Sequence, residues 1–453
     1  MSGTQRALPR LAGVSIVVVI VANALFFGLG LASVELSRQR LCERIGSAFA
    51  RGDVLAEGWL QTDTERGADP YTDCAVLQIL LYRGQPAPLN ALSVSWLGTG
   101  VKDGKLVKIC GMVQEVCRRP EEVEKDYRLY HQYWYGSRVI AGLLLGPLDL
   151  PAIRRIYTIV TYASLVAFAL AAGLASRRLL GTLAPIVLVG LFFSGISVFG
   201  PTLGQSPAFL WAIVGPTLML TTRNRASRTV GAVAIGCVAA FLDLLNAVPL
   251  HAVLLLVTVY FFEADRKGEE GTALKHAAIV LVAFAVGFAS SVLAKQILAA
   301  AAFGWVDVTS AFIEQLKWRF GMGPQAPYGV EISLAAPFRR LWASLPMLTY
   351  GSPKLAKAVA ATAVVGWVAA FAGTIAQGRR QAARRLFDWA CSLMVVLLLA
   401  GWYLALTNHT QIHSWFMVRP LFVPLALGWS LFCRIVFDSL SGSRTSATQL
   451  RQC

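Results

Sequence analysis

This chain has one apolar segment near its N-terminus, then a long polar stretch, and then a series of further apolar segments. That order constrains its fold more than any other feature. The first apolar segment runs from Leu11 to Ala32, and the second begins only near Ile153. A helix needs about 20 apolar residues to cross the hydrocarbon core of a bilayer. The order therefore predicts one membrane helix, a polar domain on one side of the membrane, and a multi-spanning region after it.

The composition is typical of a membrane protein with helical spans. Hydrophobic residues make up 56% of the 453 residues, charged residues make up 15%, and the mean hydropathy is +0.58. The apolar segments are continuous rather than alternating, which argues against a β-barrel. In a soluble protein a formal charge of +16 would favour a nucleic-acid partner. Here the basic residues lie in short connections between spans, so we expect no nucleic-acid partner.

We predict an all-α polytopic membrane protein with about ten transmembrane helices and a large extracytoplasmic loop after the first. The predicted spans lie near residues 11–32, 153–175, 182–200, 205–221, 229–245, 247–262, 276–300, 354–377, 386–406 and 416–437. The chain then divides into an N-terminal tail with the first helix (1–33), an extracytoplasmic loop domain with an interfacial helix (34–151), a multi-spanning domain (152–438) and a cytoplasmic tail (439–453).

Basic residues set the expected orientation. They precede the first span and follow the second, fourth, sixth, eighth and tenth, so all of them fall on one side if there are ten spans. Such residues collect on the cytoplasmic side of a membrane. Both termini are therefore expected in the cytoplasm and the loop domain outside it. We expect the first span to be an uncleaved anchor rather than a signal peptide, because its apolar run is long and the sequence from Ala32 to Glu35 is a poor cleavage site.

Four of the eight cysteines lie in the loop domain: Cys42, Cys74, Cys110 and Cys117. An even number of cysteines in an oxidising compartment favours disulfide bonds. Three connectivities are open, and Cys110–Cys117 is the closest pair along the chain. Four free thiols are the alternative.

Acidic residues of the loop domain are the first candidates for catalysis. Asp69 and Asp73 are four residues apart and fall on one face of a helix that would begin near Pro70, with Asp69 as its N-cap. Asp63 precedes them. A carboxylate held near apolar surface has a raised pKa and can act as a general base. The alternative is that Asp69 only caps a helix and Asp63 is solvated.

An aromatic segment, residues 127–138, precedes the second span. Tyrosine and tryptophan are enriched at membrane–water interfaces, so we expect these rings to form an interfacial belt. His131, Tyr135 and Arg138 within the segment are candidate contacts to a lipid headgroup or phosphate. The apolar run from Val139 to Leu145 is too short to span a bilayer and predicts an interfacial or re-entrant helix.

The connection between the ninth and tenth predicted spans holds the densest polar cluster. It contains Asn408, His409, His413 and Arg419, with the two histidines four residues apart. Such a set would bind a phosphate, or the histidine pair would hold a divalent metal ion. Two histidines are fewer than the three protein ligands of a usual site, so the metal stays open and no other cofactor is expected. The alternative is a polar cap with Arg419 reaching outward.

Lys295 interrupts the seventh predicted span, and a charge inside an apolar run usually has a functional reason. The known local signatures of catalysis are missing from the sequence. There is no phosphate-binding P-loop, no GxSxG motif and no HExxH motif. The sequence therefore indicates no nucleotide site.

The layout of one helix, a large outer loop with acids and many further helices resembles the GT-C superfamily of membrane glycosyltransferases. The segment Tyr133-Trp134-Tyr135-Gly136 and the connection from Asn408 to Arg419 also look like patterns in bacterial multi-spanning proteins of that layout. The resemblance implies a polyprenyl-phosphate-linked sugar donor, membrane lipids as further partners and a place in a bacterial inner membrane. It implies a catalytic carboxylate in the first outer loop, which would be Asp73, Asp69 or Asp63. It also implies substrate contacts, for which the candidates are His131, Tyr135, Arg138, Asn408, His409, His413 and Arg419.

Two other functional classes stay open. A transporter or flippase of a lipid-linked or anionic solute would place its binding groups near the middle of the membrane, often in repeated halves. The notable polar groups of this chain lie mostly at the extracytoplasmic face. The loop domain has no counterpart in the second half of the chain. A structural or assembly protein without catalysis is the third class.

Overall fold

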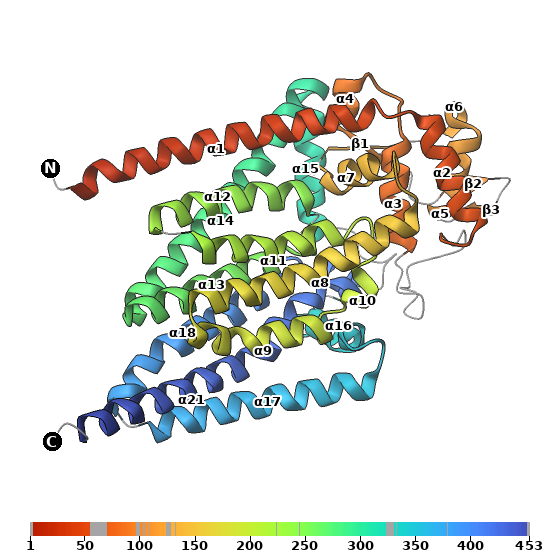
Figure 1. Ribbon diagram of the computed structural model, residues 1–453. Helices are drawn as coiled ribbons and strands as arrows, with labels where there is room; N and C mark the ends of the chain where they lie inside the picture. The colour runs from red at the N-terminus through yellow and green to blue at the C-terminus, as the bar shows by residue number, and fades with distance from the viewer. Residues whose placement is uncertain are drawn as a thin grey trace.

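The computed structural model places its long helices side by side in one bundle, with the loop domain at one end (Figure 1). The structure describes residues 3–54, 70–96, 100–102, 105–107, 109–123, 128–131, 133–222, 224–243, 245–322, 330–331, 333–377 and 379–450. Helix α1 (Gly3–Val34) begins and helix α21 (Phe422–Leu450) ends at the opposite end of the bundle. We call that end the basic end, because most of the span-flanking arginines lie there.

Eight helical segments among the described residues are long and apolar enough to cross a membrane, which is the pattern of a multi-pass membrane protein. They are α1, α8 (Leu150–Ala175), α12 (Arg225–Leu242), α13 (Val248–Lys267), α14 (Glu270–Phe303), α17 (Pro353–Ala376), α18 (Arg379–Ala405) and the segment Ser414–Leu440 that enters α21. The expectation of an all-helical membrane chain is confirmed at this level.

The two remaining predicted spans are shorter helices. Helix α9 (Arg177–Phe193) has 17 residues and α11 (Ser206–Thr221) has 16, and each contains an internal proline. At 1.5 Å per residue these helices are about 25 Å long, slightly less than the hydrocarbon thickness of a typical bilayer. They lie within the bundle, where α9 packs against α21 and α11 packs against α8. The count of ten spans therefore stays a prediction.

Helices α12 and α14 approach each other closely through glycine. A Cβ at Gly287 would lie 2.1 Å from the backbone oxygen of Val233, and one at Gly236 would lie 2.1 Å from that of Phe284. Small residues allow such short distances between helices in a membrane. The contact leaves no room for a side chain, so the helix pair requires glycine at both positions.

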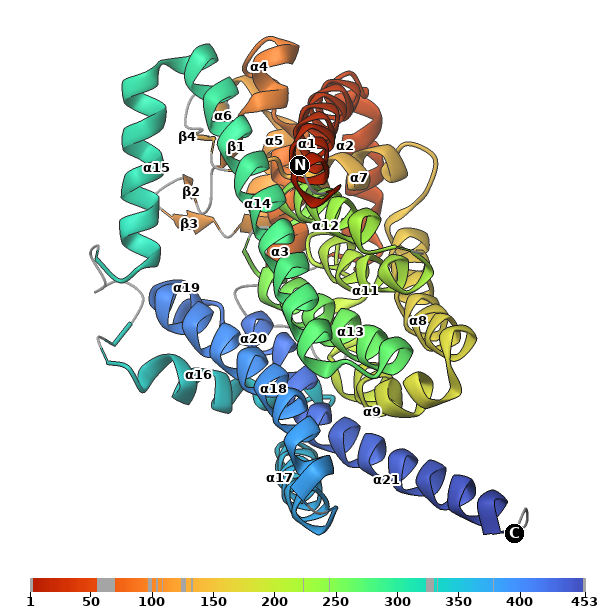
Figure 2. The same cartoon turned by 90° about the vertical axis from the view of Figure 1, so that its left-hand side faces the viewer.

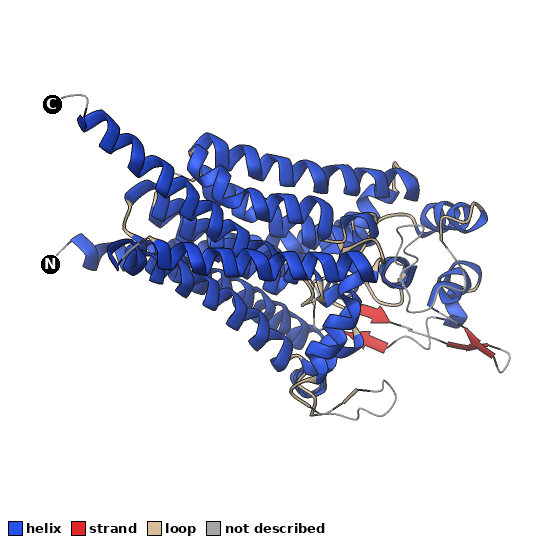
Figure 3. Ribbon diagram, turned by 90° about the horizontal axis from the view of Figure 1, so that it is seen from below, coloured by secondary structure: helices blue, strands red, loops and turns tan. Residues whose placement is uncertain are grey.

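The loop domain is mostly helical, with two short antiparallel strand pairs drawn as red arrows in Figure 3. Strand β1 pairs with β4 and β2 pairs with β3. The elements are α2 (Arg38–Ala50), α3 (Pro70–Leu81), α4 (Ala87–Leu92), β1 (Val94–Trp96), β2 (Gly100–Lys102), β3 (Lys105–Val107), α5 (Ile109–Arg118), α6 (Pro120–Val123), β4 (Arg128–Tyr130) and α7 (Gly136–Leu145). Their apolar core includes Leu41, Leu77 and Val113 and continues into Ile153 of α8. The loop domain is therefore packed onto the bundle rather than tethered to it.

Both disulfides of the loop domain join distant segments. Cys42 pairs with Cys117 and Cys74 with Cys110, with Cα–Cα distances of 5.4 and 5.1 Å. Disulfide bonding of these four cysteines is confirmed, and of the three connectivities left open the structure excludes the one that joins Cys110 to Cys117. Both residues lie on α5, seven positions apart and so about 10 Å along the helix axis, which is beyond the reach of a disulfide.

The arginines of the basic end are largely paired with buried carboxylates. Arg228 of α12 donates a hydrogen bond to Glu263 of α13. Asp388 of α18 lies 2.8 Å from Arg385 on the same helix and 3.3 Å from Arg434 of α21. Buried charged side chains are usually paired in this way. These arginines therefore hold helices together as well as marking one side of the protein.

Candidate functional site

The polar connection between α18 and α21 folds into three short helical turns at the loop-domain end. These are α19 (Thr407–Ile412), α20 (Ser414–Met417) and the 3-10 turn η4 (Arg419–Leu421). Helices α15 (Trp305–Arg319) and α16 (Ala336–Ser344) flank α19, as Figure 2 shows. The residues Asn408 to Gln411 are buried by these neighbours. The connection is therefore a packed element and not a solvated cap.

His409 is held by two side chains from distant parts of the chain. Arg319 Nη1 donates to His409 Nδ1 over 2.7 Å, and His409 Nε2 lies 2.9 Å from Asn246 Oδ1. An arginine can only donate and an amide oxygen can only accept, so this imidazole is neutral with its proton on Nε2. Burial, Arg319 and His413 lower the pKa of His409 well below its usual value. Since both ring nitrogens are engaged, His409 is not arranged as a metal ligand.

His413 lies directly beside His409. Its ring stacks on Phe416 with a centroid distance of 4.8 Å and meets the ring of His409 edge-on at 4.7 Å. Burial and the nearby Arg319 lower the pKa of His413 to about 3. Its Nδ1 atom is buried without a hydrogen-bond partner. His413 is therefore a neutral imidazole with polar capacity left over for a ligand.

Asn408 and Gln411 attach neighbouring segments to α19. Asn408 Nδ2 donates to the carbonyl oxygen of Trp318 over 2.7 Å. Gln411 makes two hydrogen bonds with the backbone of Glu331, one in each direction, at 3.0 and 2.9 Å. The contact with Trp318 fixes the end of α15, and with it Arg319, beside His409.

Arg419 turns inward. It is 1% exposed, and its Nε donates to the carbonyl oxygen of Phe416 over 3.0 Å. Its guanidinium also donates to the side-chain oxygen of Gln205 and lies 4.6 Å from the ring centroid of Phe199. The alternative in which Arg419 reaches outward is excluded.

Asn246, the acceptor for His409, is positioned by a carboxylate cap. Asp243 Oδ1 accepts from the backbone N–H of Asn246 at 2.8 Å, and Asp243 Oδ2 from that of Ala247 at 2.7 Å. Burial raises the pKa of Asp243 to about 6, although these N–H groups and Arg419 act in the opposite direction. Asp243 and Asn246 are polar residues near the end of the fifth predicted span, no sequence motif links them to His409, and their contact arises from the fold.

Asp73 lies on α3 with both carboxylate oxygens occupied. Arg154 Nη2 is 2.5 Å from Oδ2, and the backbone N–H of Leu203 donates to Oδ1 over 2.6 Å. The side chain is fully buried. This geometry fits a structural ion pair that joins α3 to α8 and to the 200–205 turn. Asp69 and Asp63, the other two candidates for a catalytic carboxylate, lie outside the described residues.

Three rings of the aromatic segment are inside the protein and not at its surface. Tyr133, Trp134 and Tyr135 are each at most 9% exposed. Trp134 packs against Phe26 of α1 with a centroid distance of 5.9 Å, and Arg319 lies 5.4 Å from the ring centroid of Tyr133. The expected interfacial belt is wrong at these three positions, because the segment inserts between bundle helices and meets protein instead of lipid.

His131 and Arg138 frame this segment. The ring of His131 stacks on Phe303 at 4.5 Å, and burial together with Lys295 lowers the pKa of His131 to about 4. Arg138, in the first turn of α7, donates through Nη1 to the carbonyl oxygen of Asn90 over 3.0 Å. Tyr135 initiates α7 with a left-handed backbone, φ 55°.

The structure thus brings together part of the predicted site. Asn408, His409 and His413 form one cluster with Arg319 and Asn246, which we call the histidine cluster. Arg419 adjoins the 200–205 turn through Gln205, and Asp73 binds the same turn through Leu203. The loop domain and the histidine cluster therefore meet at one end of the bundle, but Asp73 does not contact a histidine.

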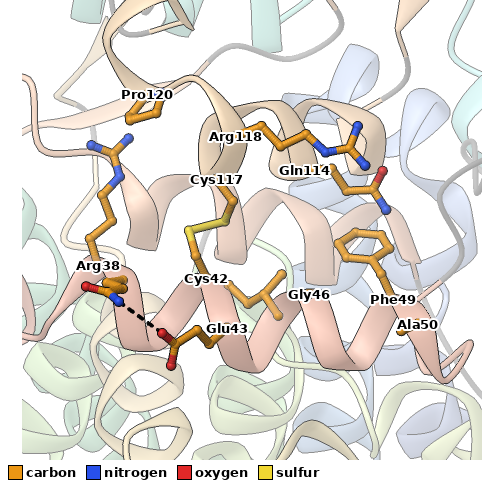
Figure 4. A pocket seen from close by; sticks show the side chains of 12 residues that line it. Arg38, Cys42, Glu43, Gly46, Phe49, Ala50, Gln114, Cys117, Arg118 and Pro120 are labelled. Atoms are coloured by element: carbon orange, nitrogen blue, oxygen red, sulfur yellow. Dashed lines mark hydrogen bonds between the residues drawn. A yellow bond between two sulfur atoms is a disulfide. The ribbon is translucent and has the colours of Figure 1, made fainter.

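A large surface pocket lies elsewhere, on the loop domain between α2 and α5 (Figure 4). Its volume is about 750 Å³, and the Cys42–Cys117 disulfide forms part of its lining, together with Glu43 and Arg118. None of the predicted site residues lines it. We therefore place the candidate site at the histidine cluster, where buried polar groups converge.

Within the described ranges, no group of three or more histidine, cysteine, aspartate or glutamate side chains is placed to hold a metal ion. The chemistry of the histidine cluster is that of neutral imidazoles and a guanidinium, which suits an anionic ligand better than a cation. No family model matches this chain, and no curated protein or solved structure is detectably similar to it.

Proposed function

We propose that this protein is a membrane glycosyltransferase, which moves a sugar from a polyprenyl-phosphate donor to an acceptor at the loop-domain end of the bundle. The observation that carries the proposal is the histidine cluster. There Arg319 lies beside the neutral rings of His409 and His413 at the junction of the membrane helices and the loop domain. Arginine binds phosphate oxygens strongly, and preorganised donors stabilise the charge that develops on a leaving phosphate.

The proposed reaction needs one base and one leaving group. The acceptor hydroxyl oxygen bonds to the anomeric carbon of the sugar while the bond from that carbon to the phosphate oxygen breaks. The polyprenyl phosphate leaves with the electron pair, and the hydroxyl proton passes to a carboxylate. Because both oxygens of Asp73 are engaged, Asp69 is our first assignment for this base and Asp63 the second.

The proposed location is a bacterial inner membrane, with the loop domain outside and both termini in the cytoplasm. Two observations support this orientation. Helices α1 and α21 have their free ends at the basic end (Figure 1), where cytoplasmic arginines are expected. Both disulfides lie at the other end, where an oxidising compartment would allow them.

The test is release of polyprenyl phosphate from a panel of polyprenyl-phosphate hexoses by the purified full-length protein. We expect Asp69→Asn to lower turnover by about 10²–10⁴-fold, the usual contribution of a general base. Arg319→Met should lower it as well, because the phosphate loses a charged donor. The matched control is Glu331→Gln, which changes an exposed carboxylate beside the cluster. Unchanged turnover in both Asp69→Asn and Arg319→Met would contradict the proposal.

A transporter of an anionic, lipid-linked solute is the second candidate. The observation that favours it is Lys295, a cation buried within α14 rather than at its end. The same assay separates the two functions. A transporter releases no polyprenyl phosphate in detergent solution, where there are no compartments, but it moves a labelled substrate across the wall of a sealed vesicle.

A further inference from the structure

Two buried cations of the chain converge on one short helix. Lys295 of α14 is 1% exposed, and its Nζ donates to the carbonyl oxygens of Leu92 and of His131, the latter over 3.1 Å. Arg138 of α7 is 4% exposed and donates through Nη1 to the carbonyl oxygen of Asn90. Asn90 and Leu92 are both in the last turn of α4, so the two cations lie at the same helix end.

No acidic side chain of the described residues pairs with either cation. Several other buried charges of this protein do have such partners: Arg228, which is 1% exposed, bonds to Glu263. A buried ion without a counter-ion is strongly unfavourable even after the protein relaxes around it. The two cations of α7 and α14 therefore require an explanation.

The free atoms of Arg138 have a specific geometry. Its Nε and Nη2 atoms are buried and have no hydrogen-bond partner. These two nitrogens form one edge of the guanidinium, the fork that binds two oxygens of a phosphate or carboxylate at once. This edge is therefore available to a ligand with two acceptor oxygens. The remaining nitrogen, Nη1, is held by the carbonyl oxygen of Asn90.

Capping of α4 explains only part of this arrangement. Cations at a helix C-terminus stabilise its last carbonyl groups, and each of the two cations makes such a contact. A cap would use one nitrogen of Arg138 and leave two others without partners, which costs free energy in a buried site. Burial lowers the pKa of Arg138 to about 10, with a smaller contribution from the nearby Arg83, and a bound anion would act in the opposite direction.

We infer that Arg138 and Lys295 form a binding site for a phosphate group, carried by an anionic lipid headgroup or by free inorganic phosphate. The fork of Arg138 takes two phosphate oxygens, and the ammonium of Lys295 supplies a second charge. The site uses other cations than the histidine cluster: Lys295 lies over the ring of Trp134, whereas Arg319 of the histidine cluster lies over the ring of Tyr133. The inference does not require glycosyl transfer.

The experiment measures ligand binding by the purified full-length protein in a neutral detergent, without a turnover assay. One arm titrates inorganic phosphate against chloride at equal ionic strength, and the other titrates phosphatidylglycerol against diacylglycerol, which lacks the phosphate. We expect saturable binding and a rise in Tm with at least one phosphate probe. A response to inorganic phosphate identifies a free-phosphate site, and a response to the lipid alone identifies a headgroup site.

Variants assign the site to its residues. Arg138→Met and Lys295→Met should each weaken binding by about tenfold or more, which corresponds to the loss of about 1.4 kcal/mol of binding free energy. Arg138→Lys keeps the charge but loses the fork, so it should fold and still bind more weakly than the parent. Arg228→Met is the control, since it removes an equally buried arginine at the basic end and should leave the affinity unchanged. The inference is overturned if neither probe binds, or if Arg138→Lys and Lys295→Met bind as the parent does.

Discussion

Asp73 is a fully buried carboxylate with a partner on each oxygen. Asp73→Asn would leave Arg154 partly buried beside a neutral amide. Breaking a buried pair in this way typically lowers the free energy of unfolding by about 3–5 kcal/mol. The measurement is unfolding of the purified protein by heat or denaturant. Glu331→Gln removes an exposed pair with Arg339 and should cost less than about 1 kcal/mol. Equal losses in the two variants would contradict this role of Asp73.

Because of His409, the free energy of unfolding should decrease as the pH falls. The pKa of His409 is lowered in the folded protein, so the unfolded chain binds more protons below the usual histidine pKa of about 6.5. The contribution to stability is therefore complete above that pH and is lost as the pH falls below it. His409→Gln retains a donor for Asn246 and an acceptor for Arg319 but does not titrate. We expect its Tm to fall less than that of the parent between pH 7 and pH 5, and parallel curves would contradict the assignment.

At the scale of elements, the contact of α12 with α14 depends on the absence of side chains. In Gly287→Ala the new Cβ would lie 2.1 Å from the backbone oxygen of Val233, so the helices must separate. Overpacking of this kind typically costs about 1–3 kcal/mol. Gly28→Ala in α1 is the control, since nothing lies within 4 Å of its Cβ position and alanine is the better helix former. Thermal unfolding should show a lower Tm for the first variant and not for the second.

Some elements of the loop domain were predictable because their signals are local. Pro70 marks the start of α3, and the short apolar run from Val139 lies in a helix, α7, of only 10 residues. The surroundings of these helices were not predictable. The rings of Tyr133 and Trp134 are suited equally to a membrane interface and to a protein interior. Only tertiary packing decides between the two: Tyr133 lies against Ile79 and Arg319, and Trp134 lies against α1 and α14.

The two ends of the bundle differ in chemistry: most span-flanking arginines lie at the basic end, and both disulfides lie in the loop domain. That difference predicts the orientation of the protein in the membrane. A cysteine in place of Arg51 would lie on the loop domain, and one in place of Glu269 would lie at the basic end; both side chains are exposed. In spheroplasts of a bacterial host, an impermeant maleimide should label Arg51→Cys directly and Glu269→Cys only after permeabilisation. The parent chain gives the background, and the reverse labelling would contradict the proposed topology.

The amino-acid sequence is enough to predict a helical chain with several membrane-spanning segments and a polar domain after the first of them. These properties depend on the length and continuity of apolar runs, which neighbouring residues specify. The tertiary structure alone decided which cysteines pair, that Arg419 meets Gln205 across 214 positions, and that His409 meets Arg319 across 90. It also decided that Lys295 and Arg138 share one helix end. Such contacts depend on how whole helices pack, and no local pattern in the chain specifies them.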